Sequence, residues 1–109
     1  MVKQGDIIQL NFNPQTGHEQ NRPALVISNE DFSRITRTAA MVCPITRTNK
    51  RFPFHISLDD RTTTAGVILC DQAKIMDIHA RNYEFIEPAP TDIVLEVIDI
   101  VAGFIAKLQ

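Results

Sequence analysis

The sequence predicts a mainly β protein, a small and strongly bent antiparallel β-barrel with one C-terminal α-helix packed against it. Two observations indicate this class. Short apolar runs separated by polar, proline- or glycine-containing segments fill residues 7–86, and a stripe of apolar residues at helical spacing fills residues 93–108. The chain has 109 residues, which suits one core, so residues 1–109 are expected to form a single domain.

Each predicted strand rests on alternation or on a short apolar run. The predicted strands cover residues 7–12, 24–28, 38–45, 54–58, 66–70 and 83–86. In the first, Ile8, Leu10 and Phe12 alternate with Gln9 and Asn11, which indicates one buried face. The second follows a proline and is apolar almost throughout, so both of its faces are expected to be covered.

Two connecting segments and the C-terminal helix complete the prediction. Residues 30–37 form a polar connector that can hold one helical turn, and residues 73–78 either extend the fifth strand or bend away from it. Residues 88–90 (Pro-Ala-Pro) end the strands. Thr91 is the expected helix cap, and the apolar stripe continues to Leu108.

The formal net charge is -2, but the charges are unevenly distributed. Residues 1–55 contain seven Lys or Arg and four Asp or Glu, whereas residues 56–109 contain four and nine. The basic half fits a polyanion site on one face, although such an asymmetry is also common by chance.

Cys43 and Cys70 lie within apolar runs, so they are expected to be buried thiols rather than a disulfide. No apolar signal core follows Met1, and the apolar stretch in residues 93–108 is too short and too charged to span a bilayer. A cytoplasmic protein without a membrane segment is expected. No set of His, Cys and carboxylate residues has metal-ligand spacing and no glycine-rich phosphate loop exists, so no metal or cofactor is expected.

An arginine after a polar loop and a threonine at the end of a strand are the most informative functional features. Arg22 follows the polar segment 17–21 and begins an apolar run, and Thr46 closes the third predicted strand. A planar, permanently charged guanidinium and a hydroxyl suit a phosphate group without a metal. Each residue also has a purely structural interpretation. Arg22 can pair with Glu19, and Thr46 can cap the local backbone.

Neighbouring polar residues are further candidates. His18 is a candidate acid or base near neutral pH, or a solvated loop histidine. Glu19 can orient Arg22, and Gln20 lies between them in the same polar segment. Phosphate steering by a basic loop after Thr46 is the remaining candidate, and a solvated charged face is its alternative. The basic residues of this loop are Arg47, Lys50 and Arg51.

Two aromatic positions carry structural expectations of their own. Phe54 is expected in the core, and His55, which alternates with core residues, is expected to face solvent or a partner.

These motifs resemble those of the MazF/PemK family of toxin endoribonucleases, in family order. The matching segments are Lys3-Gln4-Gly5-Asp6-Ile7-Ile8, Phe12-Asn13-Pro14, Gly17-His18-Glu19-Gln20, Arg22-Pro23-Ala24-Leu25-Val26-Ile27, Pro44-Ile45-Thr46, Phe52-Pro53-Phe54 and Gly66-Val67-Ile68-Leu69-Cys70-Asp71-Gln72-Ala73-Lys74. The resemblance covers most of residues 3–81. One departure is a shorter loop, because only Asn21 stands between the Glu-Gln and Arg-Pro pairs.

The resemblance implies an SH3-like barrel of the MazF/PemK/CcdB type and a metal-independent, sequence-specific endoribonuclease. Its substrate would be single-stranded mRNA, cut to 2',3'-cyclic phosphate and 5'-OH ends. Arg22 falls on the family's catalytic arginine and Thr46 on its catalytic threonine, while the general base is left unassigned. Gln20 would contact a base or the RNA backbone, and Gln72 and Lys74 would line the RNA groove. The implied partners are a second copy of the chain and a MazE-like antitoxin with an acidic segment that is disordered when free.

Two alternatives remain open from the sequence. The chain could be a non-enzymatic toxin of the same barrel type, like the CcdB family that poisons DNA gyrase through a protein surface. It could also be a family member that has lost activity and only binds its partner.

Overall fold

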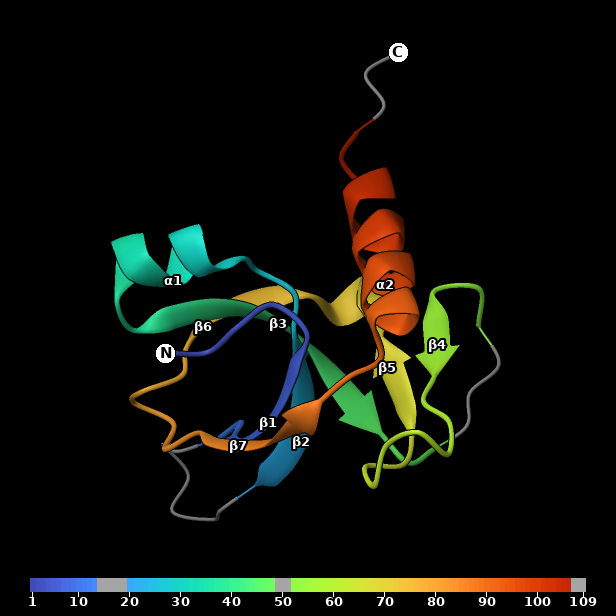
Figure 1. Ribbon diagram of the computed structural model, residues 1–109, viewed down its shortest axis with the longest axis horizontal. Coiled ribbons are helices and arrows are strands. Elements are labelled where there is room, and N and C mark those ends of the chain that lie inside the picture. Colours follow the sequence, from blue (N-terminus) through green and yellow to red (C-terminus); the bar gives the residue numbers. More distant parts are fainter. Residues whose placement is uncertain (14–19, 49–51, 107–109) are drawn as a thin grey trace.

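The computed structural model describes residues 1–13, 20–48 and 52–106, which form an antiparallel sheet and two α-helices (Figure 1). The strands are β1 (Asp6–Asn11), β2 (Asn21–Val26), β3 (Ala39–Thr46), β4 (His55–Ser57), β5 (Val67–Leu69), β6 (Lys74–Asp77) and β7 (Glu84–Pro88). The helices are α1 (Glu30–Thr36), the short 3-10 helix η2 (Cys70–Gln72) and α2 (Thr91–Gly103).

The predicted mainly β class with a C-terminal helix is confirmed. Hydrogen-bonded neighbours follow the order β4-β5-β3-β2-β1-β7, and β6 pairs with β3 beside this path. The sheet is strongly curved (Figure 1). Among the described residues no strand pairing joins β7 to the far end of the sheet, so a fully closed barrel is not shown.

The third strand changes partners along its length. On one edge, β3 pairs with β6 from Ala39 to Val42 and with β5 from Ile45 to Thr46. Cys43 and Pro44 lie between these two ladders, opposite the interruption formed by η2. Pro44 has no backbone N–H to donate, so a position between two ladders accommodates it at little cost.

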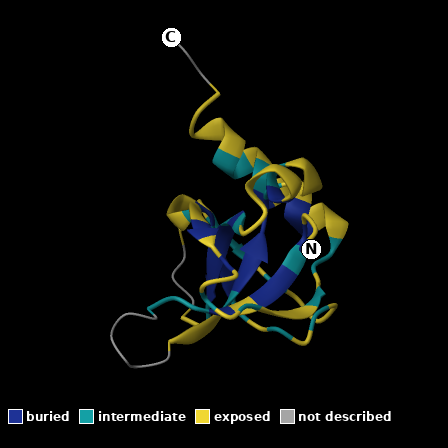
Figure 2. Cartoon of the chain, turned by 90° about the vertical axis from the view of Figure 1, so that its left-hand side faces the viewer, coloured by how far each residue is buried: buried dark blue, intermediate teal, exposed yellow. Residues whose placement is uncertain are grey.

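The two faces of the sheet bury two separate apolar clusters. On the face covered by α2, here called the α2 face, side chains such as Ile7, Leu25 and Ile45 pack against Ile93 and Val97 of the helix. The opposite face buries a second cluster. This cluster contains Val2, Ile8, Leu10, Ala24, Val26, Ala40, Val42, Met76 and Ile78. Buried residues accordingly concentrate in the central strands (Figure 2). The first strand therefore has two buried faces at Ile7 and Ile8, where one was expected, because α2 covers the second face.

Both helices differ from the expectation at their ends. The polar connector holds a seven-residue helix whose first turn is capped by the Asn29 side chain, which accepts from the Phe32 N–H at 3.0 Å. Thr91 is the first residue of α2 rather than its cap, and Pro90 occupies the cap position without a side-chain hydrogen bond. The second helix ends at Gly103, so the predicted continuation of the stripe is wrong at Phe104 and Ile105, which are exposed. No helix in the described part of the chain is long and apolar enough to cross a membrane.

The expectations for Phe54 and His55 are both wrong. Phe54 is 37% exposed, and its ring packs edge-on against Phe104 of the α2 C-terminal end at 4.8 Å between centroids. The His55 side chain is only 9% exposed and lies 3.2 Å from the Asp71 carboxylate of η2. His55 is covered and Phe54 is exposed because η2 and the end of α2 pack against this part of the chain. Alternation within one strand does not predict such contacts.

Two sets of polar interactions stabilise the turn between β4 and β5. Arg61 bonds to Asp59 within the turn and to Asp92 at the start of α2, with 2.8 Å between charged atoms in both pairs. The Glu87 carboxylate of β7 accepts from the N–H and hydroxyl groups of both Thr63 and Thr64, at 2.7–3.0 Å. These bonds hold residues 59–65 against β7 and α2.

We expect Glu87→Gln to reduce stability at neutral pH, and the reduction to disappear in acid. Hydrogen bonds from Thr63 and then Thr64 lower the pKa of Glu87 from 4.5 to about 2. A depressed folded-state pKa stabilises the fold above the unfolded value, and this contribution is lost as the pH falls from 4.5 to about 2. Denaturant melts at pH 7 and at pH 2–3 measure the difference. Glu30→Gln, at an exposed glutamate, is the control. An effect of Glu87→Gln that does not change with pH would contradict this account.

Candidate active site

Arg22 and Thr46 project from the same face of the sheet. Arg22 pairs with Leu10, whose side chain belongs to the cluster on the face away from α2. Ala24 pairs with Pro44. Because side chains alternate along a strand, Arg22, Ala24, Pro44 and Thr46 all point to that face. Arg22 and Thr46 each lie two residues beyond the last pair of the β2–β3 ladder, Ala24 and Pro44.

The sheet divides at this point. The ladder between β2 and β3 ends at Ala24 and Pro44, after which β2 stays with β1 and β3 turns to β5 (Figure 1). On the α2 face a cavity of about 230 Å³ opens where the strands part. It is lined by Gln9, Pro23, Ile45, Arg47, Thr63, Thr64, Ala65 and Ile86. Arg22 in β2 and Thr46 in β3 therefore lie beyond the last pair of this ladder, where the two strands are no longer paired with each other.

Both side chains are available to a ligand. Arg22 is exposed, and within the described residues it has no hydrogen-bond or ion-pair partner. Thr46 is half-buried, and its Oγ1 accepts from the Thr48 N–H at 3.3 Å. This bond uses an acceptor site of the hydroxyl and leaves its O–H proton to donate. The capping interpretation of Thr46 is therefore correct, and it is compatible with a second contact to a phosphate.

Lys74 joins this face, supported by an aromatic residue that sequence reasoning did not place in the site. Lys74 pairs with Val42 of the buried cluster, so it points to the same face as Arg22. Its ammonium lies 5.4 Å from the centre of the Phe12 ring, a cation–π arrangement. The spacing of two shared by Ile8, Leu10 and Phe12 indicated which face Phe12 points to, but nothing in the sequence indicated its contact with Lys74.

The backbone around Phe12 is held by Arg81. The Arg81 guanidinium donates to the carbonyl oxygens of Asn11 and Phe12 at 3.2 and 2.9 Å. The Phe12 N–H donates to the Gln20 carbonyl at 3.1 Å. No local pattern in the sequence signalled this role of Arg81, because it joins segments about seventy residues apart.

Three of the remaining predicted site residues lie in the described part of the chain, and all three are exposed. Gln20 is exposed beside β2, Gln72 is exposed at the end of η2, and Arg47 is exposed and lines the 230 Å³ cavity. The predictions for four residues lie outside the described part of the chain. These are His18, Glu19, Lys50 and Arg51.

The cysteines are not candidate nucleophiles. Both are free and buried, as predicted. Burial raises the pKa of Cys43 to about 12 and that of Cys70 to about 11. Thiols with such values are protonated at neutral pH and therefore poorly reactive.

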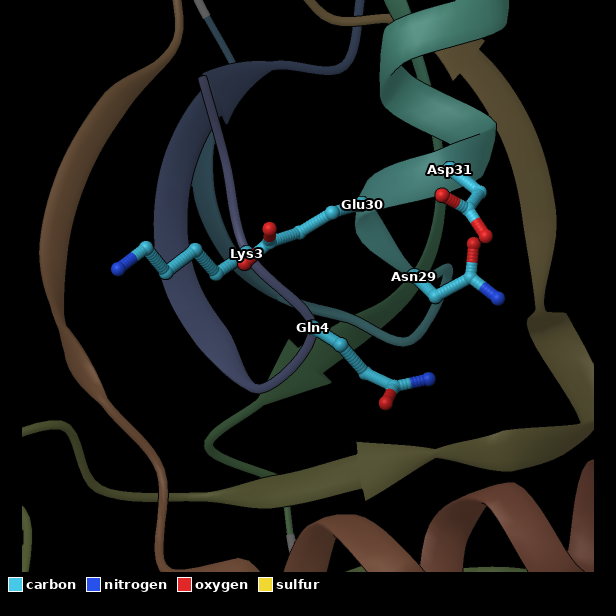
Figure 3. A pocket seen from close by; sticks show the side chains of 5 residues that line it. All are labelled: Lys3, Gln4, Asn29, Glu30 and Asp31. Carbon is cyan, nitrogen blue, oxygen red and sulfur yellow. The ribbon is translucent and has the colours of Figure 1, made fainter.

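Another cavity, of about 460 Å³, lies beside α1 (Figure 3). Asn29 caps the helix, Asp31 pairs with Arg34 at 2.7 Å, and Gln4 donates to the Ile27 carbonyl at 2.8 Å. The Lys3 ammonium points away from Asn29 and Asp31 (Figure 3). Three of the five side chains that line this cavity are thus hydrogen-bonded or ion-paired within the protein.

Comparison with known proteins identifies similar sequences. Residues 3–105 match the model of a family described as the PemK-like, MazF-like toxins of type II toxin-antitoxin systems. The chain is 34% identical over 103 residues to the endoribonuclease PemK of Escherichia coli, covering 89% of this chain and 77% of that protein. It is 35% identical over 106 residues to the endoribonuclease toxin ChpB of Escherichia coli K12, covering 88% and 87%.

Solved structures give the same result. A MazE-MazF crystal structure from Deinococcus radiodurans superposes with a TM-score of 0.88 at 31% identity, covering 98% of both chains. MazF alone from the same organism gives 0.86 at 31% identity and 97% coverage of both. These findings do not favour the CcdB-like alternative. This chain belongs to the PemK-like, MazF-like toxins of type II toxin-antitoxin systems.

Proposed function

We propose that this protein is a metal-independent endoribonuclease that cuts single-stranded RNA at Arg22 and Thr46. The observation that carries the proposal is the placement of these two side chains on one face, where β2 and β3 part, with Arg22 unpaired among the described residues. Relatives that match most of the chain are named endoribonucleases. Membership in the family supports an active enzyme over one that only binds a partner.

The chemistry requires no external nucleophile. The 2'-oxygen of the RNA attacks the adjacent phosphorus, its proton passes to a base that we leave unassigned, and the bond from phosphorus to the 5'-oxygen breaks. The departing 5'-oxygen takes up a proton. The products are a 2',3'-cyclic phosphate and a 5'-OH end, so atoms and charge balance without water entering the step.

Arg22 and Thr46 act on the phosphate. The guanidinium donates to the non-bridging oxygens as negative charge builds up on them, which is where fixed donors contribute most to catalysis. The Thr46 hydroxyl, oriented by the Thr48 N–H, donates to a phosphate oxygen or positions the 2'-OH. Lys74 and Arg47 provide positive charge on either face of the divided sheet.

We further propose a homodimer in the cytoplasm and an antitoxin partner. Structures similar to this one include MazE-MazF complexes, which supports a cognate antitoxin. An acidic, disordered segment of that antitoxin would cover the exposed cations on this surface. Exposed apolar side chains at the end of α2, Phe104 and Ile105, supply apolar surface for a second copy. Light scattering of the purified protein tests the dimer, and a monomeric mass at micromolar concentration would contradict it.

The direct test of the activity is to incubate purified protein with single-stranded RNA in EDTA and to analyse the fragment ends. We expect discrete fragments whose 3' ends carry a cyclic phosphate and whose 5' ends are phosphorylated only after kinase treatment. Intact RNA under these conditions would refute the proposed function.

A further inference from the structure

Phe52 is a half-exposed aromatic residue that takes no part in the chemistry described so far. It begins the tight turn before β4, where the His55 N–H donates to the Phe52 carbonyl at 3.0 Å. Two neighbouring rings pack against its ring. The Phe54 ring meets it edge-on at 5.4 Å between centroids, and the His55 ring lies 5.2 Å away at an angle of 42°. These contacts orient the Phe52 ring, yet the residue remains 49% exposed.

The His55 ring that supports Phe52 is itself fixed. The side chain of His55 is 9% exposed, and its Nε2 lies 3.2 Å from the Asp71 carboxylate of η2. The Cys70 N–H donates to the Phe54 carbonyl at 3.1 Å, which ties η2 to the same turn. Because Phe52 is held by packed and hydrogen-bonded groups, its ring can bind a flat ligand without losing much side-chain freedom.

The strand register places Phe52 beside the face that carries the proposed active site. Thr46 pairs with Val67 of β5, and Val67 pairs with Ser57 of β4. His55 is two residues from Ser57 along β4, so its side chain points to the same face as that of Thr46. The Phe52 ring packs against this His55 ring. Since only β5 separates β4 from β3, the two strands lie about 10 Å apart (Figure 1).

The charges on this face favour a nucleic acid over a protein segment as the ligand of the ring. The side chains of Arg22 and Lys74 point to the same face, and both residues are exposed. Cations of this kind attract phosphates. Proteins that bind single-stranded nucleic acids combine such a path for the backbone with aromatic side chains on which the bases stack. Phe52 supplies the aromatic part of this combination.

We propose that Phe52 stacks against one unpaired base that flanks the cut bond, while the phosphate of that bond lies at Arg22 and Thr46. Unpaired bases can be splayed out of a strand, and an aromatic ring binds any base through its flat face. A strand that runs from Thr46 across β5 towards β4 brings a neighbouring base over the Phe52 ring. The ring thus contributes to binding of the strand rather than to the chemical step.

This inference rests on the proposed function, and the first experiment measures single-turnover cleavage at increasing protein concentration. The proteins are wild type, Phe52→Ala, Phe52→Trp and the control Ile35→Ala, which shortens an apolar residue that is 77% exposed on α1. We expect Phe52→Ala to need about tenfold more protein for half-maximal cleavage, with an unchanged maximal rate, and the other two variants to behave as wild type. A Phe52→Ala protein with the half-maximal concentration of wild type, or a defect that tryptophan does not restore, would overturn the inference and leave the proposed function standing.

A second experiment separates the inference from catalysis. Each base of a short single-stranded RNA, made uncleavable by 2'-O-methyl groups, is removed in turn, and the affinity for wild type and for Phe52→Ala is measured. A loss of affinity of about tenfold at one position in wild type, absent in Phe52→Ala, supports stacking even if no RNA is cut. Equal losses in both proteins, or no binding by wild type, would overturn it. An unchanged RNA affinity with a lower mass of Phe52→Ala in light scattering would also overturn it, because the ring would then contact a second copy of the chain.

Discussion

Arg22→Ala is expected to lower the rate of RNA cleavage by on the order of 10² to 10³, while leaving the fold unchanged. Arg22 is exposed and its side chain makes no hydrogen bond or ion pair within the described residues, so removal of the side chain costs little stability. The loss falls on the transition state, where charge on the phosphate is greatest. Single-turnover cleavage of one RNA substrate and a thermal melt of each protein measure the two effects.

The matched controls are Arg22→Lys and Arg34→Ala. Lysine keeps the charge but not the planar pair of donors, so we expect an intermediate rate. Arg34 lies on α1 and pairs only with Asp31 across exposed surface, so its removal should leave cleavage unchanged. If Arg22→Ala cut RNA at the wild-type rate, the catalytic assignment of Arg22 would be wrong.

Gly66→Ala is expected to destabilise the fold by about 2–4 kcal/mol and to reduce cleavage. Gly66 has a φ of 137°, in the region that residues with a side chain rarely adopt. A Cβ there would lie 2.5 Å from the Thr46 carbonyl oxygen and 3.1 Å from Cγ2 of Ile45. The strand that carries Thr46 would have to move, and its hydroxyl would move with it. Chemical denaturation and single-turnover cleavage measure the two consequences.

Gly103→Ala provides the control for this substitution. Apart from its chain neighbours and the backbone of α2, no atom of the described residues lies within 4 Å of a Cβ added at Gly103. Alanine there should therefore be tolerated or should stabilise α2 by up to about 1 kcal/mol. A Gly66→Ala protein as stable and as active as Gly103→Ala would show that the close approach to Thr46 is unimportant.

Much of the fold followed from local patterns in the sequence. Short apolar runs between breakers located every strand except β6, which was left open as an extension or a bend. The apolar stripe located α2 because the buried positions Ile93, Val94 and Val97 recur at helical spacing. The predictions that were wrong concern positions set by contacts between distant segments. Alternation placed His55 outward, but η2 brings Asp71 against it. The stripe predicted helix beyond Gly103, but Phe104 and Ile105 lie outside α2 and are exposed.

The candidate site also combines residues that the sequence identified with contacts that it did not predict. Arg22, Thr46 and Lys74 were identified by residue type and by resemblance, and the register of β2, β3 and β6 places them on one face. The role of Phe12 under Lys74, the anchoring by Arg81 and the close approach of Gly66 to Thr46 arise from pairings between segments far apart along the chain. Reading one sequence from local patterns does not give such pairings.

If Arg22 and Thr46 assist attack by the 2'-OH of the RNA itself, cleavage of a bond requires the 2'-OH of the nucleotide immediately 5' of it. The most direct test is an RNA with one 2'-deoxy nucleotide, placed immediately 5' of the bond that wild type cuts, incubated in EDTA beside the unmodified RNA. We expect no cleavage at that bond in the deoxy substrate and normal cleavage in the unmodified one. Cleavage of both at equal rates would show that another nucleophile attacks the phosphate and would contradict the account.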